Sequence, residues 1–130
     1  MKSLGNHLLI ELYECDEQTL NDKDRIEEII MKGVQLSGAE IIAPVFHKFS
    51  PHGVSGVVVI AESHFTIHTW PEFGYCALDI FTCGDKIDSK KALLFLKDEL
   101  GAGNISVVET KRGILNLPVE KILHKPEGAK

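Results

Sequence analysis

The sequence predicts an α+β fold in two layers, an antiparallel sheet with its helices on one face. Two segments carry apolar residues at helical spacing, and several short segments around them are rich in β-branched and aromatic residues. The strand-like segments in the middle of the chain are separated only by tight turns. Parallel neighbours need a connection of about a dozen residues or more, so these strands must pair antiparallel.

The strands are expected in six places. Residues 8–15 alternate between apolar and polar side chains, as in a strand with one buried face. The run Val57-Val58-Val59-Ile60 is β-branched throughout, which favours a buried strand. Turn residues in Pro51-His52-Gly53 and Pro71-Glu72-Phe73-Gly74 separate neighbouring strands. In chain order the expected strands cover 8–15, 41–49, 54–61, 65–70, 75–83 and 105–108, and a continuation of the last one to 114 is left open.

Two helices are expected between these strands. The first follows a polar, turn-like stretch over 16–24, where Asn21 or Asp22 can cap it, and Gly38 can end it. The second opens at Asp88-Ser89. The apolar positions are Ile26, Ile29, Ile30 and Val34 in the first helix, and Ala92, Leu93, Phe95, Leu96 and Leu100 in the second.

Both helices are expected on the same face of the sheet, which leaves the other face without a cover in a single chain. Phe, Val and Ile occupy both sets of alternating strand positions, so part of the uncovered face is expected to be apolar. Apolar patches of this kind are commonly buried by a second copy of the chain. We therefore expect a partner subunit on this face.

Length and composition exclude several classes of protein. The chain has 130 residues and 14.4 kDa, which fits one domain over 1–130. A net charge of −5 without a basic stretch argues against binding to nucleic acid or to an anionic membrane. The longest aliphatic run, Val57 to Ala61, is far too short to cross a bilayer. Three cysteines without C-x-x-C spacing and an N-terminus unlike a signal peptide indicate a cytoplasmic protein.

Reactive side chains are concentrated in residues 61–84, AESHFTIHTWPEFGYCALDIFTCG, which include the only tryptophan. His64 and His68 would lie side by side on a helix, but about 13 Å apart along a strand, too far to share a zinc ion. The β-branched and aromatic residues around them favour the strand. No metal site is therefore expected.

Ser63 and His68 could instead act as nucleophile and base, which must come within about 2.6–3.2 Å of each other. Strand alternation puts these two residues on opposite faces unless a turn intervenes. A turn is expected near Ser63, because one strand ends at Ala61 and another begins at Phe65. We therefore expect Ser63 at a tight junction, with His68 and Cys83 on neighbouring strands, where its hydroxyl can attack the carbonyl before it.

The motifs E-S-H at 62–64, I-H-T-W-P-E at 67–72 and F-T-C-G at 81–84 resemble those of prokaryotic S-adenosylmethionine decarboxylases. The resemblance covers nearly the whole chain, and its length fits the short, single-repeat, pyruvoyl-dependent branch of that family. It implies an enzyme that converts S-adenosylmethionine to decarboxylated S-adenosylmethionine and CO₂ for polyamine synthesis. It also implies a homodimer of αβ units that stacks its two sheets with the helices outside and has its active sites near the subunit interface.

The resemblance further implies that the chain cuts itself between Glu62 and Ser63, into a β chain of 1–62 and an α chain of 63–130. The Ser63 hydroxyl attacks the Glu62 carbonyl, and elimination and hydrolysis then leave a covalent pyruvoyl group at the start of the α chain.

By the same resemblance, three further residues take part. His68 transfers a proton during processing, Ser55 assists processing, and Cys83 is the proton donor of the finished enzyme.

The chemistry of the implied reaction is consistent with these residues. Loss of CO₂ from an α-amino acid leaves a carbanion, and a pyruvoyl carbonyl in a Schiff base with the substrate amine takes up that charge. The Cys83 thiol can then protonate the carbon. Phe49 and Trp70 offer flat surfaces for an adenine ring or a sulfonium centre, and Glu72 can accept hydrogen bonds from ribose hydroxyls.

Two other functions stay open on the sequence. Relatives with the same processing act on ornithine or arginine, and acidic residues placed to meet a distal amine or guanidinium would favour those substrates. An aromatic-lined pocket favours a nucleoside. The non-enzymatic alternative is a small dimeric α+β binding module that never cuts itself, in which Ser63→Ala would change nothing except stability.

Overall fold

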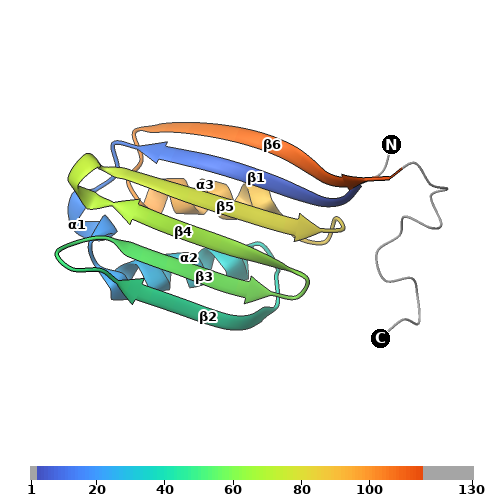
Figure 1. Cartoon of the computed structure of the whole chain (residues 1–130), viewed down its shortest axis with the longest axis horizontal. Helices are drawn as coiled ribbons and strands as arrows, with labels where there is room; N and C mark the ends of the chain where they lie inside the picture. Colours follow the sequence, from blue (N-terminus) through green and yellow to red (C-terminus); the bar gives the residue numbers. More distant parts are fainter. Residues whose placement is uncertain (1–2, 116–130) are drawn as a thin grey trace.

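One antiparallel sheet of six strands forms the front layer of the molecule, with helices behind it (Figure 1). The computed structural model describes residues 3–115 of the chain. The strands lie in the order β2-β3-β4-β5-β1-β6. In chain order the elements are β1 (Ser3–Tyr13), α1 (Glu17–Leu20), α2 (Lys23–Leu36), β2 (Ile41–Lys48), β3 (Val54–Ile60), β4 (Ser63–Trp70), η1 (Pro71–Phe73), β5 (Tyr75–Cys83), α3 (Ser89–Glu99) and β6 (Asn104–Ile114). The predicted α+β fold, with an antiparallel sheet and its two long helices on one face, is confirmed.

The structure extends the sequence-based expectation in two places. The polar stretch after β1 contains the short helix α1, which Asp16 caps by accepting a hydrogen bond from the backbone N–H of Thr19 at 2.9 Å. Strand β6 continues to Ile114, because its whole length pairs with β1, from Asn104 opposite Tyr13 to Ile114 opposite Ser3. The expectation that the tail frays after Pro118 lies outside the described residues.

The core lies between the sheet and helices α2 and α3. Alternate residues of the strands point into it and are fully buried, among them Ile10, Leu12, Val58, Ile67 and Ile80. The helices supply the opposite side with the apolar positions expected from the sequence, including Ile26, Ile30, Val34, Ala92 and Leu96. The helices approach closely at Gly33, where an added Cβ would lie 2.8 Å from the Leu96 Cδ2.

Both long helices begin at an aspartate that caps them. The Asp22 carboxylate accepts from the backbone N–H of Arg25 at 3.1 Å, and the Asp88 carboxylate accepts from that of Lys91 at 3.0 Å. Of the two capping residues that the sequence allowed for α2, Asp22 is therefore the cap. Asn21 instead accepts from the backbone N–H of Gly53 at 3.1 Å and ties the helix entry to the start of β3.

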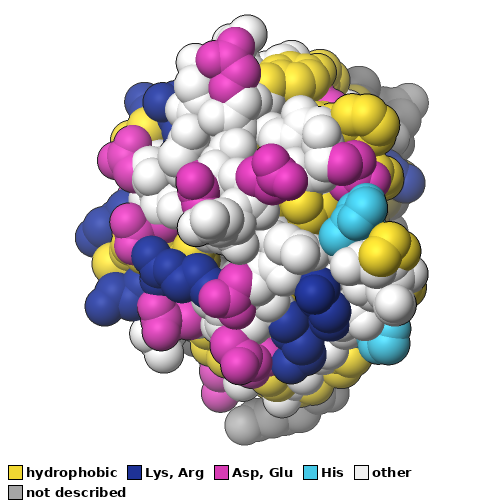
Figure 2. Space-filling model, turned by 90° about the vertical axis from the view of Figure 1, so that its left-hand side faces the viewer, with side chains coloured by type: hydrophobic (Ala, Val, Ile, Leu, Met, Phe, Trp, Pro, Cys, Tyr) yellow, Lys and Arg dark blue, Asp and Glu magenta, His cyan; other side chains and the backbone are white. Residues whose placement is uncertain are grey.

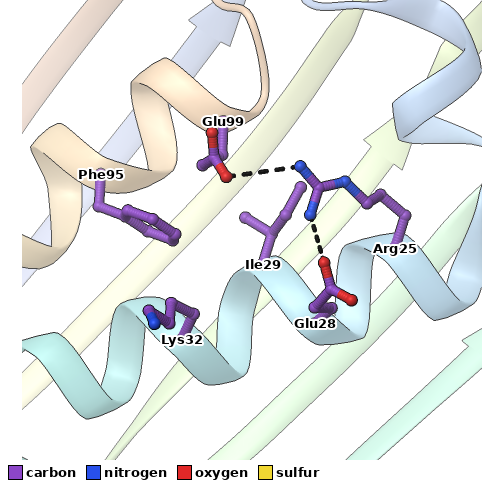
Figure 3. Close-up of a pocket in the computed structure, with 6 residues that line it drawn as sticks. All are labelled: Arg25, Glu28, Ile29, Lys32, Phe95 and Glu99. Atoms are coloured by element: carbon purple, nitrogen blue, oxygen red, sulfur yellow. Dashed lines mark hydrogen bonds and ion pairs between the residues drawn. The ribbon is translucent and has the colours of Figure 1, made fainter.

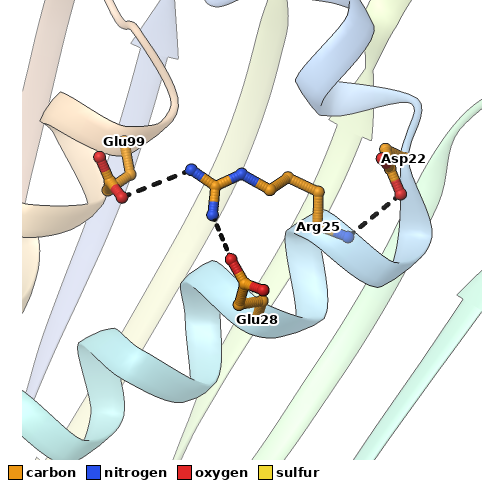
Figure 4. A network of polar contacts seen from close by, with 4 residues as sticks. All are labelled: Asp22, Arg25, Glu28 and Glu99. Carbon is orange, nitrogen blue, oxygen red and sulfur yellow. Dashed lines mark hydrogen bonds and ion pairs between the residues drawn. The ribbon is translucent and has the colours of Figure 1, made fainter.

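A charged groove runs over the outer surface of the helix layer, between α2 and α3. The guanidinium of Arg25 bridges Glu28 on its own helix and Glu99 on α3, the latter at 3.4 Å (Figure 4). Beside this network lies a groove of about 270 Å³ over Ile29, Lys32 and Phe95 (Figure 3). Helices α2 and α3 separate it from the opposite face of the sheet, on which Ser55 and His68 lie.

The face of the sheet turned away from the helices, here called the open face, is partly apolar. Large hydrophobic side chains that are at least 40% exposed and belong to this face are Leu9, Tyr13, Val45, Val59, Trp70 and Val108. Figure 2 views the end of the molecule where β4 finishes, and shows hydrophobic and histidine side chains next to each other along one side. Charged side chains form separate patches over the rest of that view, among other side chains and backbone drawn in white.

Candidate active site

Ser63 is the first residue of β4 and follows a two-residue turn, Ala61-Glu62, from β3. Its hydroxyl donates a hydrogen bond to the carbonyl oxygen of Glu62, the residue before it. Glu62 has a φ of 73°, in the left-handed region that non-glycine residues seldom adopt. Backbone strain of about 1–3 kcal/mol is typical of such positions and is often found at functional sites. The side-chain oxygen of Ser63 therefore lies against the peptide group that precedes it, at a strained turn.

Cys83 lies at the same end of the sheet as Ser63. It is the last residue of β5, and β4 and β5 pair with His64 opposite Phe81. Continuing this antiparallel register by one residue puts Thr82 opposite Ser63, so Cys83 is one position further along. The Cys83 thiol is free and partly buried. We call these two residues the Ser63–Cys83 half-site.

Ser55 and His68 form a second pair near the other end of the same strands. They are directly opposite each other in the β3–β4 register, and the Ser55 Oγ lies 2.8 Å from the His68 Nδ1. This hydrogen bond orients the imidazole on the open face and leaves its Nε2 pointing away from Ser55. We call this pair the Ser55–His68 half-site.

The two half-sites are well separated within one chain. Ser63 and His68 lie on the same strand five residues apart, which corresponds to about 17 Å. Alternation also assigns them to opposite faces, since Phe65, Ile67 and Thr69 face the core. The expectation that a turn brings Ser63 and His68 together is therefore wrong, because the turn precedes Ser63 and β4 is continuous from Ser63 to Trp70.

The residues expected to contact a substrate gather at the Ser55–His68 end. Trp70 ends β4, with its ring centroid 6.5 Å from that of His68. Phe49 follows β2, and Glu72 belongs to the short helix η1, where it forms an ion pair with His52 at 3.0 Å. All of these side chains are partly or largely exposed. The described chain thus offers aromatic surface and a carboxylate close to one half-site, and the nucleophile and thiol at the other.

Sequence reasoning missed an aromatic row that continues from Trp70 across β5 and β1. Tyr75 stacks near Trp70 with 5.2 Å between ring centroids, and Tyr13 stacks on Tyr75 at 5.5 Å. The Tyr75 hydroxyl donates a hydrogen bond to the Glu11 carboxylate. Burial, together with this hydrogen bond, raises the pKa of Tyr75, which keeps the hydroxyl protonated. Strand alternation puts these residues on one face, but only the register between strands shows that they touch.

The other two cysteines, Cys15 and Cys76, are buried in the core. Cys15 and Cys76 contact each other, and the hydrogen bond between the thiols, reinforced by burial, raises the pKa of Cys76. Neither is placed to react with a substrate on the open face.

Metal and membrane features were searched over residues 3–115. No group of three or more His, Cys, Asp or Glu side chains there is arranged to hold a metal ion. None of the helices in that range is long and apolar enough to span a membrane.

Comparison with known proteins places this geometry in a family. The family model for S-adenosylmethionine decarboxylase matches residues 6–113. The chain belongs to this enzyme family. The match includes β2 to β5, most of β1 and β6, and both half-sites, so the S-adenosylmethionine decarboxylase family accounts for nearly the whole described fold.

Individual relatives agree with the family match. The S-adenosylmethionine decarboxylase proenzyme of Clostridium tetani is 55% identical over 119 residues, which are 92% of this chain and 94% of that protein. The proenzyme of Acidithiobacillus ferrooxidans is 44% identical over 129 residues, with 97% of each chain covered. Among solved structures, the adenosylmethionine decarboxylase of Aquifex aeolicus superposes with a TM-score of 0.82 at 34% identity, and covers 88% of this chain and 95% of its own.

Proposed function

We propose that this chain is a self-processing, pyruvoyl-dependent decarboxylase that converts S-adenosylmethionine to decarboxylated S-adenosylmethionine and CO₂ for polyamine synthesis. Family membership and relatives named S-adenosylmethionine decarboxylase proenzyme support the substrate and the self-processing. The observation that carries the proposal is the hydrogen bond from the Ser63 hydroxyl to the Glu62 carbonyl, which holds a nucleophile against the peptide bond to be cut.

Processing begins when the Ser63 Oγ forms a bond to the Glu62 carbonyl carbon. The C–N bond between Glu62 and Ser63 then breaks, so that an ester replaces the amide and a free amine forms on Ser63. Elimination removes the Ser63 α-proton and expels the Glu62 carboxylate, and water hydrolyses the remaining enamine to a pyruvoyl group and ammonia. The products are chains 1–62 and 63–130. His68, oriented by Ser55, is the proposed carrier of the proton in the elimination.

In the decarboxylation, the carbonyl of the pyruvoyl group would supply the electron sink that accepts the pair left behind by CO₂. Cys83 is one position beyond the residue opposite Ser63 and ends β5 at the same end of the sheet, so its thiol is the proposed donor of the proton that the substrate carbon gains. The aromatic rings of Phe49 and Trp70 would hold the purine, and the Glu72 carboxylate would accept hydrogen bonds from the ribose hydroxyls. An aromatic surface of this kind favours a nucleoside over ornithine or arginine.

The separation of the half-sites supports a homodimer of αβ units with shared active sites. A serine nucleophile and its proton carrier need contact within about 3 Å, whereas Ser63 and His68 of one chain lie about 17 Å apart. Cys83 alternates to the open face, as His68 does, and the Glu62–Ser63 peptide lies at the same end of the sheet as Cys83. Two-fold stacking of the open faces would bring this end of one copy to the Ser55–His68 half-site of the other. It would also bury the exposed apolar residues of the open face, with the helices outside.

Denaturing mass spectrometry of freshly purified protein tests the processing. We expect two chains that break between Glu62 and Ser63, the larger one blocked at its N-terminus, and a single uncut chain for Ser63→Ala. A chain that stays intact after warm incubation contradicts the proposal. Release of CO₂ from S-adenosylmethionine, and not from ornithine or arginine, then tests the substrate, and release from either amino acid would replace S-adenosylmethionine in the proposal.

A further inference from the structure

The aromatic row beyond Trp70 suggests a role for residues that the processing and decarboxylation steps do not use. Trp70 and Tyr75 are opposite each other where β4 and β5 meet, and their rings are inclined by 33°. Tyr13 covers the far side of Tyr75 with its ring inclined by 28°. Trp70 is 40% exposed, so one surface of its ring stays open while Tyr75 packs beside it.

Tyr75 is the fixed member of this row. Its hydroxyl donates to the Oε2 of Glu11, which lies on β1 and is 64 residues away in the sequence. Glu11 is half-buried and pairs with Ala77, which is two residues from Tyr75 on the same face of β5. A phenol held both by stacking and by a hydrogen bond to a carboxylate has little rotational freedom. By contrast, the Tyr13 hydroxyl has no hydrogen-bond partner among residues 3–115.

We infer that Tyr75 and Glu11 are positioning residues, which hold the Trp70 ring in the orientation that receives the purine of the substrate. This inference rests on the proposed function for the role of Trp70 in binding. The contact between the rings and the hydrogen bond behind them do not depend on it. Because these residues act only through the Trp70 ring, on the binding of the purine, their loss raises KM and leaves the chemical step unchanged.

The test uses the purified, processed protein and its single tryptophan, whose fluorescence reports on Trp70 alone. For Tyr75→Phe we expect KM for S-adenosylmethionine to rise by about fivefold, the effect of one ordinary hydrogen bond, with kcat within about twofold. We also expect acrylamide to quench Trp70 more strongly in this variant without substrate, because the ring is less restrained. Tyr13→Phe is the matched control: it also removes one tyrosine hydroxyl but keeps both the ring and the Tyr75–Glu11 bond.

Glu11 provides an independent variant in case Tyr75→Phe folds poorly. Glu11→Ala should reproduce the rise in KM and in quenching, whereas Glu11→Gln, which still offers a carbonyl acceptor, should restore much of both. The inference would be overturned if Tyr75→Phe had the same acrylamide quenching and the same KM as Tyr13→Phe. It would also be overturned if Tyr75→Phe lowered kcat and left KM unchanged. If the unmodified protein releases no CO₂ from S-adenosylmethionine, the proposed function fails, while quenching still decides whether Tyr75 and Glu11 restrain Trp70.

Discussion

Co-expression of two inactive variants tests whether each active site is divided between two chains. Ser63→Ala removes the proposed nucleophile from the Ser63–Cys83 half-site, and His68→Ala removes the proposed proton carrier from the other half-site. Ser63 and His68 of the same chain lie about 17 Å apart and cannot react with each other. Neither variant can therefore be processed without an intact half-site from another chain. We expect each variant, expressed alone, to remain a single uncut chain of 14.4 kDa.

The expected result for the mixture follows from two-fold pairing. A dimer with one chain of each kind has one site with both half-sites intact and one site with both altered. Random pairing of equal amounts makes about half of the dimers mixed, so about a quarter of all sites are complete. Only the His68→Ala chain still carries Ser63, so about half of the His68→Ala chains should be cut and none of the Ser63→Ala chains.

Denaturing mass spectrometry measures this directly, since the two full-length chains differ in mass. The control pairs Ser63→Ala with Cys83→Ala: both changes fall in the same half-site, so decarboxylation should not rise above that of Cys83→Ala alone. Absence of cutting in a mixture whose native mass spectrum shows mixed dimers would refute the divided site. Normal cutting of His68→Ala expressed alone would refute the role of His68.

Three further outcomes are expected. Cys83→Ala should still be cut, but its rate of CO₂ release should fall at least about a hundredfold. Full activity of this variant would contradict the role of Cys83 as the proton donor. Gly56→Ala should lower the free energy of unfolding in urea by about 1–3 kcal/mol, because the new Cβ would overlap the Phe46 ring. A further Phe46→Leu change in the same chain should recover part of the loss. An unchanged urea midpoint for Gly56→Ala would contradict this packing. The raised pKa of Tyr75 means that the folded protein keeps this proton at a pH where an unfolded tyrosine loses it. The contribution of Tyr75 to stability is therefore complete below about pH 10 and is lost as the pH rises further. Tyr75→Phe should therefore flatten the alkaline part of a stability–pH curve, and an unchanged curve would contradict the raised pKa.

The sequence predicted most of the fold, because the pattern within each segment is strong. The bounds of β5 agree with its alternating residues over 75–83, and both helix starts coincide with aspartates that cap them. The prediction was weakest for β6, whose residues 109–112 are polar and carry no alternating apolar pattern. Pairing with β1 makes that segment a strand, and pairing between distant segments cannot be read from one segment alone.

The site residues illustrate the same limit. The motifs identified Ser63, His68 and Cys83 as a group, and alternation already indicated that Ser63 and His68 face opposite ways. Their separation along one continuous strand became clear only from the bounds of β4. The contact between Tyr75 and Glu11 could not be predicted either, since it depends on the register of β1 against β5.

The strand order has a consequence for how the processed protein would unfold and refold. The proposed cut before Ser63 would leave β1, β2 and β3 in one fragment and β4, β5 and β6 in the other. In the sheet these fragments interleave, with shared boundaries at β3–β4, β5–β1 and β1–β6. Folding of the uncut chain is unimolecular, whereas the two fragments, once unfolded, must find each other again at a rate set by their concentration. The proposed cut would thus make the stability of the folded protein kinetic, governed by the rate at which the two fragments unfold and separate.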